Sequence, residues 1–425
     1  MTNAAEARAA VERVARASYG RLLALVASRT GDIAQAEDAL ADAFERALSS
    51  WPLTGQPTNP EGWLLTVARN RQRDDLRSAA YRLASPLDEA LLPVLDALPD
   101  DLALNSFPDE RLALLFACAH PAIDPAVRTP LILQTVLGFQ ANQLAPAFAI
   151  PTATLAQRLV RAKRRIRDAV IPLTVPEPNL LHERLPAVLE AIYGCYSISW
   201  QGSQQASVKS ASSEAQYLAI SAAALLKNEP EAWAIAALIT LSMARSLSRD
   251  QGRYLPVADQ DPRLWNARLV AEGNQYLRRS AVTRAEHAHL LPIARFELEA
   301  AIQSIHCTRI DGLEPNANDL LTLYSALMRA APTLGVLIAL ALATAKVSGP
   351  ITGLQILDNT NDARLTNFQP AWAALLSEAG DDDAANKAYL RAVEFADSAE
   401  TGSWLLARIT FDQLAAEGFT GHTKG

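Results

Sequence analysis

Apolar residues recur at three- and four-residue spacing along most of this chain, the pattern of amphipathic α-helices. A clear example covers residues 35–48. Its apolar face is expected to hold Ala36, Ala39, Leu40, Ala43, Phe44, Ala47 and Leu48. Its opposite, mainly acidic face is expected to hold Gln35, Glu37, Asp38, Asp42, Glu45 and Arg46. The spacing therefore predicts a helix with an acidic outer surface.

The same spacing continues through the second half of the chain, where the loops carry Pro, Gly, Asn and Asp. The predicted helices cover residues 185–196, 214–227, 231–246, 263–279, 294–306, 317–330, 334–346, 351–357, 370–379 and 383–396. From Pro370 to Ala396, small residues lie where two paired helices would touch, and Gly380 lies at the turn. This stretch resembles a tetratricopeptide repeat (TPR). Stacked helix pairs of this kind form concave surfaces that bind peptides or proteins.

Length and composition narrow the fold class. A chain of 425 residues predicts two or three domains, because a single hydrophobic core stops growing at about 250–300 residues. Ala and Leu dominate over the β-branched residues, which favours an all-α fold. The chain has no run of about 18 uncharged apolar residues, so we expect a soluble, cytoplasmic protein with no membrane partner. Its three scattered cysteines, Cys118, Cys195 and Cys307, are expected to be buried packing residues.

The net charge of −7 predicts that any contact with nucleic acid is local, because phosphate binding needs positive potential. Two windows are basic: residues 63–82 hold five arginines against two aspartates, and residues 151–170 hold six basic residues against one aspartate. Between them, residues 83–107 are acidic and interrupted by prolines, which predicts an extended linker. Three prolines within residues 171–179 predict a second boundary.

The first basic window belongs to a longer motif. The acidic helix is followed by a polar loop and then by Pro60-Glu61-Gly62-Trp63-Leu64-Leu65-Thr66-Val67-Ala68-Arg69-Asn70. Over residues 10–82 this succession resembles region 2 of the extracytoplasmic-function (ECF) sigma factors of the sigma-70 family. The resemblance implies a helical bundle that binds RNA polymerase and the minus-ten element of a promoter.

The resemblance also implies roles for individual residues. The acidic helix would dock on the clamp helices of the polymerase β′ subunit through Glu37, Asp38 and Asp42, with Phe44 as a core anchor. The minus-ten element, melted to single strands, would be contacted by Asn59, Arg69, Asn70, Arg73 and Arg77. The loop 54–59 lies where the family captures a flipped base, and it has no aromatic residue, so base contacts there would be hydrogen bonds. Trp63 is expected to be a core residue.

A second motif surrounds the other basic window. Helices are predicted over residues 126–137 and 142–148, and a basic helix over residues 152–166 completes a helix-turn-helix pattern. The residues expected to face inward are Leu155, Leu159, Ala162 and Ile166. The sequence from Ile150 to Lys163 resembles sigma region 4, which would cover residues 108–172 and contact the polymerase β flap. The minus-thirty-five element would then be contacted by Thr152, Thr154, Gln157, Arg158 and Arg161.

Two details of this module concern its chemistry. Pro146 lies inside the first helix of the motif, where it removes a hydrogen-bond donor, so that helix is expected to start late or kink. Cys118 and His120 have the spacing of metal ligands, but no further Cys or His lies nearby, so we expect them to be packing residues.

Residues 180–420 are predicted to form a TPR-like helical extension. The order of the two sigma regions followed by this extension resembles a subgroup of the ECF sigma factors, and Asp259-Gln260-Asp261-Pro262-Arg263-Leu264-Trp265 resembles a stretch that recurs there. The chain departs from the subgroup at residues 193–200, which lack its Phe-Asn-Glu-Gly-Tyr signature. We expect the extension to be regulatory, with an anti-sigma factor or another regulatory protein as a conceivable partner.

Two other classes of protein fit the sequence less well. An enzyme is disfavoured, because the sequence has no paired nucleophile and base, no phosphate-binding loop and no metal-ligand spacing, and no cofactor is expected. The alternative is a one-component regulator with a helix-turn-helix domain and a helical domain that senses a ligand or protein. Such a regulator has no need of the acidic helix and the Trp63-to-Asn70 motif that follows it.

Overall fold

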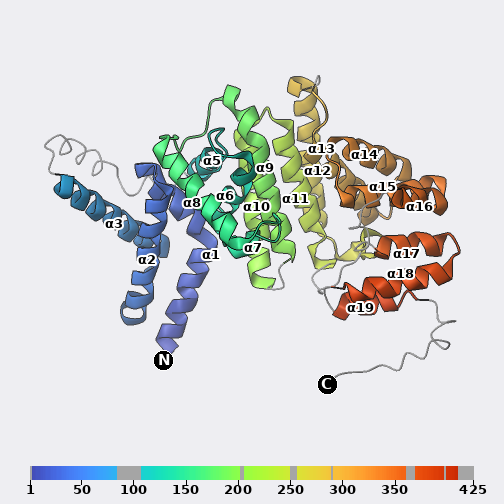
Figure 1. The fold of residues 1–425 in the computed structure, drawn as a ribbon, viewed down its shortest axis with the longest axis horizontal. Helices are drawn as coiled ribbons and strands as arrows, with labels where there is room; N and C mark the ends of the chain where they lie inside the picture. Colours follow the sequence, from blue (N-terminus) through green and yellow to red (C-terminus); the bar gives the residue numbers. More distant parts are fainter. Residues whose placement is uncertain are drawn as a thin grey trace. The chain divides into compact units, whose positions relative to one another are not determined.

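A computed structural model describes residues 2–83, 107–201, 205–248, 256–288, 291–359, 369–396 and 399–409. Over these residues the chain forms helices and turns with no β-strand (Figure 1), which confirms the predicted all-α fold. Contacts divide the chain into two compact units, residues 1–222 (unit 1) and 223–425 (unit 2). Apart from its two end residues, the predicted linker over residues 83–107 lies outside the described part of the chain.

Unit 1 begins with three helices that pack pairwise into a bundle: α1 (Thr2–Thr30), α2 (Ile33–Thr54) and α3 (Pro60–Leu83). Asp32 caps α2, because its carboxylate accepts hydrogen bonds from the backbone N–H groups of Ala34 and Gln35, at 3.0 and 3.1 Å. The predicted apolar face of α2 is buried except at Phe44, which is half-buried, and at Leu48, which is 44% exposed. The α2 pattern therefore predicted the buried face correctly apart from these two positions.

The rest of unit 1 consists of α5 (Phe107–Cys118), α6 (Pro125–Thr135), α7 (Ala141–Leu144), α8 (Thr152–Asp168), α9 (Pro178–Gln201) and most of α10 (Gln205–Leu225). Helix α9 packs on α5 and α6. Arg111 on α5 is buried and forms an ion pair with Glu214 on α10, and burial lowers the pKa of Arg111 to about 10. The first two helices after the prolines of residues 171–179 are thus bound into unit 1.

Unit 2 contains α11 (Pro230–Ala244), α12 (Ala267–Thr283), α13 (Arg295–Cys307), α14 (Ala317–Ala330), α15 (Leu334–Ser348), α16 (Pro350–Asp358), α17 (Gln369–Glu378), α18 (Asp382–Glu394) and α19 (Ala399–Leu406). Helices α11 and α12 approach closely at Gly273, where an added Cβ would lie 2.6 Å from Cγ of Leu241. From α13 onward each helix packs on the next, as expected of a helical repeat array.

All ten helices predicted after residue 184 are present. The largest differences are at α9 and α10, which begin earlier than predicted, at Pro178 and Gln205. Within the described ranges, no helix is long and apolar enough to cross a membrane.

Candidate nucleic-acid interface

Helix α8 presents a row of polar and basic side chains to solvent. Its stripe of Leu155, Leu159, Ala162 and Ile166 is buried, as predicted, so the opposite face is turned outward. All five residues predicted to contact the minus-thirty-five element are exposed: Thr152, Thr154, Gln157, Arg158 and Arg161. A basic helix anchored by one buried stripe can place arginines against phosphates and base edges of a duplex.

The helix that precedes α8 is shorter than predicted. The sequence predicts a helix over residues 142–148, whereas α7 ends at Leu144. The predicted late start or kink at Pro146 is wrong: the helix starts at Ala141 and ends before Pro146, which cannot donate a backbone hydrogen bond, and residues 145–149 form turns. Ala149 has a positive φ of 51°, and Pro151 then leads into α8. The helix-turn-helix motif therefore has a first helix of a single turn.

The residues predicted to contact the minus-ten element lie at the start of α3 and along it. The Asn59 side chain accepts a hydrogen bond from the backbone N–H of Gly62 at 2.9 Å and so caps the helix. Arg77 is exposed, whereas Arg69, Asn70 and Arg73 are half-buried, and the Arg73 guanidinium donates to the Asn70 side chain. Arg69, Asn70 and Arg73 are therefore partly enclosed by neighbouring residues, whereas Arg77, further along α3, is open to solvent.

Three side-chain contacts hold α3 on α1. The buried Gln72 side chain donates to the backbone carbonyl of Val26 at 3.3 Å. Near the start of α3, the Glu61 carboxylate lies 2.7 Å from Arg21 and accepts a hydrogen bond from Ser18. These bonds hold α3 in place along α1, so the orientation of its basic residues is set by the bundle.

The three acidic residues predicted to dock on polymerase have different surroundings on α2. Asp38 is exposed, and Asp42 lies 3.1 Å from Arg71 on α3. Glu37 was expected to face outward, but its carboxylate oxygens lie 2.6 and 2.8 Å from Nζ of Lys163 on α8. Burial, together with the charges of Glu37 and Asp38, raises the pKa of the Tyr19 hydroxyl above its usual range. Only Asp38 is therefore both exposed and unpaired with α3 or α8.

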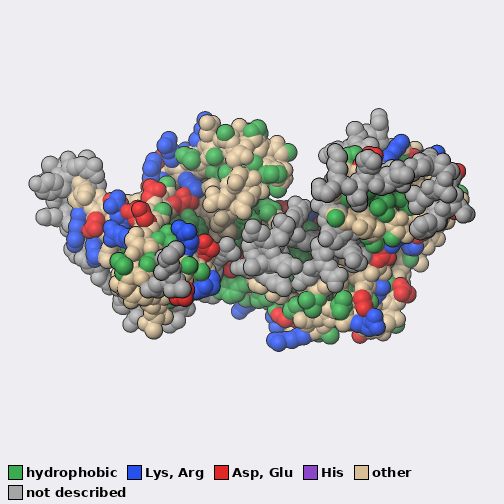
Figure 2. Space-filling model, turned by 90° about the horizontal axis from the view of Figure 1, so that it is seen from below, with side chains coloured by type: hydrophobic (Ala, Val, Ile, Leu, Met, Phe, Trp, Pro, Cys, Tyr) green, Lys and Arg blue, Asp and Glu red, His purple; other side chains and the backbone are tan. Residues whose placement is uncertain are grey.

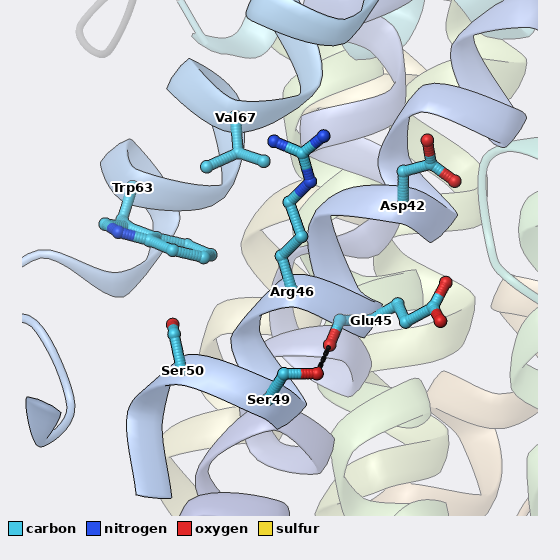
Figure 3. A pocket seen from close by; sticks show the side chains of 7 residues that line it. All are labelled: Asp42, Glu45, Arg46, Ser49, Ser50, Trp63 and Val67. Atoms are coloured by element: carbon cyan, nitrogen blue, oxygen red, sulfur yellow. Dashed lines mark hydrogen bonds between the residues drawn. The ribbon is translucent and has the colours of Figure 1, made fainter. Parts of the chain in front are cut away.

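A groove between α2 and α3 lies beside this acidic face (Figure 3). Its lining residues are Asp42, Glu45, Arg46, Ser49 and Ser50 of α2 and Trp63 and Val67 of α3. Trp63 was predicted to be core, but it is half-buried: its ring meets Trp51 edge-on at 5.6 Å and borders the groove. The groove thus offers an aromatic ring with carboxylates and hydroxyls around it.

Charge is mixed on the visible surface of the α1–α3 bundle. In Figure 2, basic and acidic side chains lie interspersed at the left of the view, over the part that α1 to α3 occupy in Figure 1. The described side chains of this face form no continuous basic patch, so any positive potential there is local to individual arginines.

Cys118 at the end of α5 is a packing residue, as predicted, whereas His120 just after it is only half-buried and does not fit that prediction. Cys118 is fully buried, and burial raises the pKa of its thiol to about 12. Nδ1 of His120 accepts a hydrogen bond from the backbone N–H of Ala122 at 3.1 Å. In the described ranges, no group of three or more His, Cys, Asp or Glu residues is arranged to hold a metal ion.

The motif at residues 259–265 connects several helices of unit 2 through non-covalent contacts. It includes two short 3-10 turns, η2 (Val257–Asp259) and η3 (Pro262–Leu264). The guanidinium groups of Arg245 and Arg309 both lie over the buried Trp265 ring, at 5.9 and 5.8 Å from the ring centre. Asp259 forms an ion pair with Arg408 after α19. The motif therefore ties α11 to η5 (Thr308–Asp311) and to the C-terminal end of the described chain.

Sequence reasoning missed two residues that shape unit 1. Lys163 was grouped with the basic residues of α8, but it lies beside the buried stripe and is only 8% exposed. Gly20 belongs to no motif, yet α1 meets the C-terminal end of α6 at this position, where an added Cβ would overlap the carbonyl oxygen of Val136. The spacing of Lys163 from Leu159 and Ile166 could have suggested a half-inward position.

Two known families match parts of the chain. Residues 14–82 match Sigma-70 region 2, and residues 184–281 match a family of unknown function, DUF6596. The first match covers α1 to α3, and the second runs from α9 into α12. No solved structure matches the chain.

Some relatives match most of the chain and others match a smaller part of it. The uncharacterized protein R00370 of Rhizobium meliloti is 31% identical over 392 residues, 90% of each chain. The ECF RNA polymerase sigma factor SigL of Mycobacterium tuberculosis is 32% identical over 170 residues, 39% of this chain and 93% of SigL. The probable ECF RNA polymerase sigma factor SigI of the same species is 32% identical over 164 residues, 38% of this chain and 55% of SigI.

Proposed function

The chain belongs to the ECF RNA polymerase sigma factors of the sigma-70 family, and we propose how it divides the work of promoter-specific transcription initiation among its helices. Its partners are core RNA polymerase and promoter DNA, and its family is one of initiation factors rather than enzymes. The observation that carries the division is that one chain joins a region 2 bundle to a second basic helix, α8, whose five candidate DNA contacts are all exposed.

Polymerase docking is assigned to the acidic face of α2. Glu37, Asp38 and Asp42 would meet basic residues on the clamp helices of the β′ subunit. Asp38 is available as the protein stands, whereas Glu37 and Asp42 already have basic partners in unit 1. Charge complementarity of this kind speeds association and fixes the orientation of two partners.

Reading of the minus-ten element is assigned to α3 and the loop before it. Asn59, Arg69, Asn70, Arg73 and Arg77 supply amide and guanidinium groups for phosphates and unstacked bases. The base-capturing loop at residues 54–59 has no aromatic side chain, and the nearby Trp63 ring already packs on Trp51. Recognition by hydrogen bonds rather than by stacking in this loop is therefore favoured.

Reading of the minus-thirty-five element is assigned to α8. Its outward face would enter the major groove with Thr152, Thr154, Gln157, Arg158 and Arg161, and residues 108–172 would rest on the polymerase β flap. Arginine can form bidentate hydrogen bonds with guanine or contact a phosphate, and Gln157 can form hydrogen bonds with adenine. The buried stripe behind these residues keeps them on one surface.

The helices after residue 180 are assigned a regulatory role. Helix α9 packs on α5 and α6, and the repeat-like array of unit 2 is an architecture that binds proteins. We assign to this part the modulation of promoter use, either directly or through an anti-sigma or other regulatory protein.

The docking assignment is tested by the affinity of the full chain for core RNA polymerase. Asp38→Arg reverses a charge on the docking face and should weaken binding by about tenfold or more, 1.4 kcal/mol or more. Glu183→Arg makes the same change at an exposed position on α9 and serves as the control. Equal binding by the wild type and the Asp38 variant would contradict the assignment, and no binding by the wild type would contradict the function itself.

A further inference from the structure

Basic and aromatic side chains of unit 2 gather around Trp265, the last residue of the motif that the sigma functions leave unused. The guanidinium groups of Arg245, at the end of α11, and of Arg309, in η5, both lie over the Trp265 ring, at 5.9 and 5.8 Å from its centre. Arg245 also donates a hydrogen bond to the side chain of Gln303 on α13. His306 lies one turn after Gln303, on the same face of α13. We call these side chains, together with Tyr324 on α14, the Trp265 cluster.

His306 and Tyr324 supply uncharged polar groups to the Trp265 cluster. Nε2 of His306 lies 3.4 Å from the Tyr324 hydroxyl. Burial and the positive charges of Arg245 and Arg309 lower the pKa of His306 to about 4, and burial raises the pKa of Tyr324 to about 12. Both side chains are therefore uncharged at neutral pH, so the arginines set the sign of the charge in the cluster.

Arg309 brings a positive charge that no carboxylate of the described residues neutralises by direct pairing. Its guanidinium donates to the backbone carbonyl of Val257, which is a neutral acceptor, and its side chain is half-buried. The nearby acidic side chains of the motif and of α13 are instead bound by other arginines. These pairs are Asp259–Arg408, Asp261–Arg263 and Glu299–Arg295. Arg309 is therefore available to an anion from outside the chain.

Trp265 contributes a hydrogen-bond donor that has no acceptor. The side chain is 5% exposed, and within the described ranges its buried indole Nε1 has no hydrogen-bond partner. A buried donor without a partner is costly, and in native proteins such a group is commonly satisfied by a bound water or ion. Beside the charge of Arg309, this donor favours a bound group that carries both oxygen acceptors and a negative charge.

We propose that the Trp265 cluster binds the carboxylate of a small organic acid, with Arg309 supplying the charge and Trp265 and Tyr324 supplying hydrogen bonds. A carboxylate has the planar shape that a guanidinium binds with two parallel N–H bonds. A small molecule fits better than a protein segment, because Arg245 and Trp265 are only 4% and 5% exposed. Arg309 and Tyr324 are half-buried, which leaves an approach from solvent.

The bound acid would connect α11, α13 and α14 through one ligand, which makes it an effector of unit 2. This deepens the regulatory role assigned to the helices after residue 180 by naming the chemical class of the signal. The binding site stands on the geometry of unit 2 alone, whereas its regulatory meaning rests on the proposed function.

Binding is measured on the full-length chain by nuclear magnetic resonance, with acetate and succinate as carboxylate probes and inorganic phosphate for comparison at equal ionic strength. The indole N–H signal of Trp265, identified as the signal that is missing in Trp265→Phe, reports on the site directly. We expect acetate or succinate to shift this signal in a saturable manner, with an affinity at least tenfold higher than that of phosphate. No saturable shift with either carboxylate, or equal or tighter binding of phosphate, overturns the proposal.

Two substitutions test which side chains hold the carboxylate. Arg309→Gln removes the charge and should weaken binding by about tenfold or more. Tyr324→Phe keeps the packing of the ring and removes only the hydroxyl, so it should weaken binding by about three- to tenfold and decides the case if the Arg309 variant does not fold. Arg278→Gln removes an exposed arginine of α12 and should leave the affinity unchanged. Wild-type affinity in both Arg309→Gln and Tyr324→Phe contradicts the assignment.

The regulatory meaning is measured separately, as transcription by core RNA polymerase and the full-length protein with and without saturating succinate. We expect succinate to change the amount of transcript at least threefold with the wild type and to have no effect with Arg309→Gln. Unchanged transcription with a protein that binds succinate contradicts the effector role. A protein that binds succinate but supports no transcription at all contradicts the proposed function, so the two failures are distinguishable.

Discussion

Truncating the chain tests whether the two sigma regions fold stably without helix α9. A chain that stops at residue 179 removes α9, whose Leu185, Val188, Leu189 and Ile192 side chains are each at most 4% exposed. Burial of one such aliphatic side chain contributes about 1.5–3 kcal/mol, so the loss is roughly 6–12 kcal/mol before relaxation. This is comparable to the whole stability of a domain, about 5–15 kcal/mol.

The truncated chain should therefore be unfolded or molten at 25 °C, with exposed apolar surface on α5 and α6. A chain that stops at Ala222 keeps α9 and the Arg111–Glu214 ion pair and should remain folded. Thermal unfolding followed by circular dichroism, together with binding of a hydrophobic dye, distinguishes the two chains. Equal melting temperatures would refute the reasoning, because α9 would then contribute nothing to unit 1.

Three further predictions concern single side chains. Burial, with Arg245 and Arg309 nearby, lowers the pKa of His306 from 6.5 to about 4, so the unfolded chain binds the extra proton between these values. Unit 2 should therefore lose about 3 kcal/mol of its free energy of unfolding as the pH falls from 6.5 to 4. In urea unfolding, His306→Asn should abolish this loss, whereas the control His287→Asn, at an exposed position, should not. Trp265→Ala should lower the free energy of unfolding of unit 2 by about 3–5 kcal/mol, because a large buried ring leaves a cavity; a loss below 1 kcal/mol in the same assay would show that the contacts of this ring are weak. Arg158→Ala should weaken binding of the polymerase complex to promoter DNA and reduce the salt dependence of that binding by about one phosphate contact, and an unchanged salt slope would remove Arg158 from the interface.

Local patterns in the sequence were sufficient for the helices and for much of the candidate site. The buried stripe of α8 follows from the spacing of Leu155, Leu159, Ala162 and Ile166, and the same spacing correctly predicted that Arg158 and Arg161 are exposed. A break near Pro146 follows from the missing amide proton, although its form, an early end rather than a late start or kink, was not predicted. These features depend on residues within one or two helical turns, which is why the sequence is enough to predict them.

Features that depend on distant segments could not be predicted in this way. The spacing within α2 predicts an outward position for Glu37. Its ion pair with Lys163 cannot be predicted from that spacing, because Lys163 lies 126 residues further along the chain. Trp63 was assigned to the core, but its exposure depends on how α3 crosses α2 at the groove. Likewise, the packing of α9 on α5 and α6 is a property of three helices together, which prolines at residues 171–179 did not reveal.

Reconstituted transcription tests the central claim most directly. Core RNA polymerase is combined with the full-length protein and a library of promoter fragments carrying varied minus-ten and minus-thirty-five elements, and the transcripts are sequenced. We predict initiation from a defined subset of promoters only when the protein is present, with the subset changed by Arg161→Ala on α8. Transcription that does not depend on the protein, or that starts without regard to either element, would contradict its assignment as a promoter-specific sigma factor.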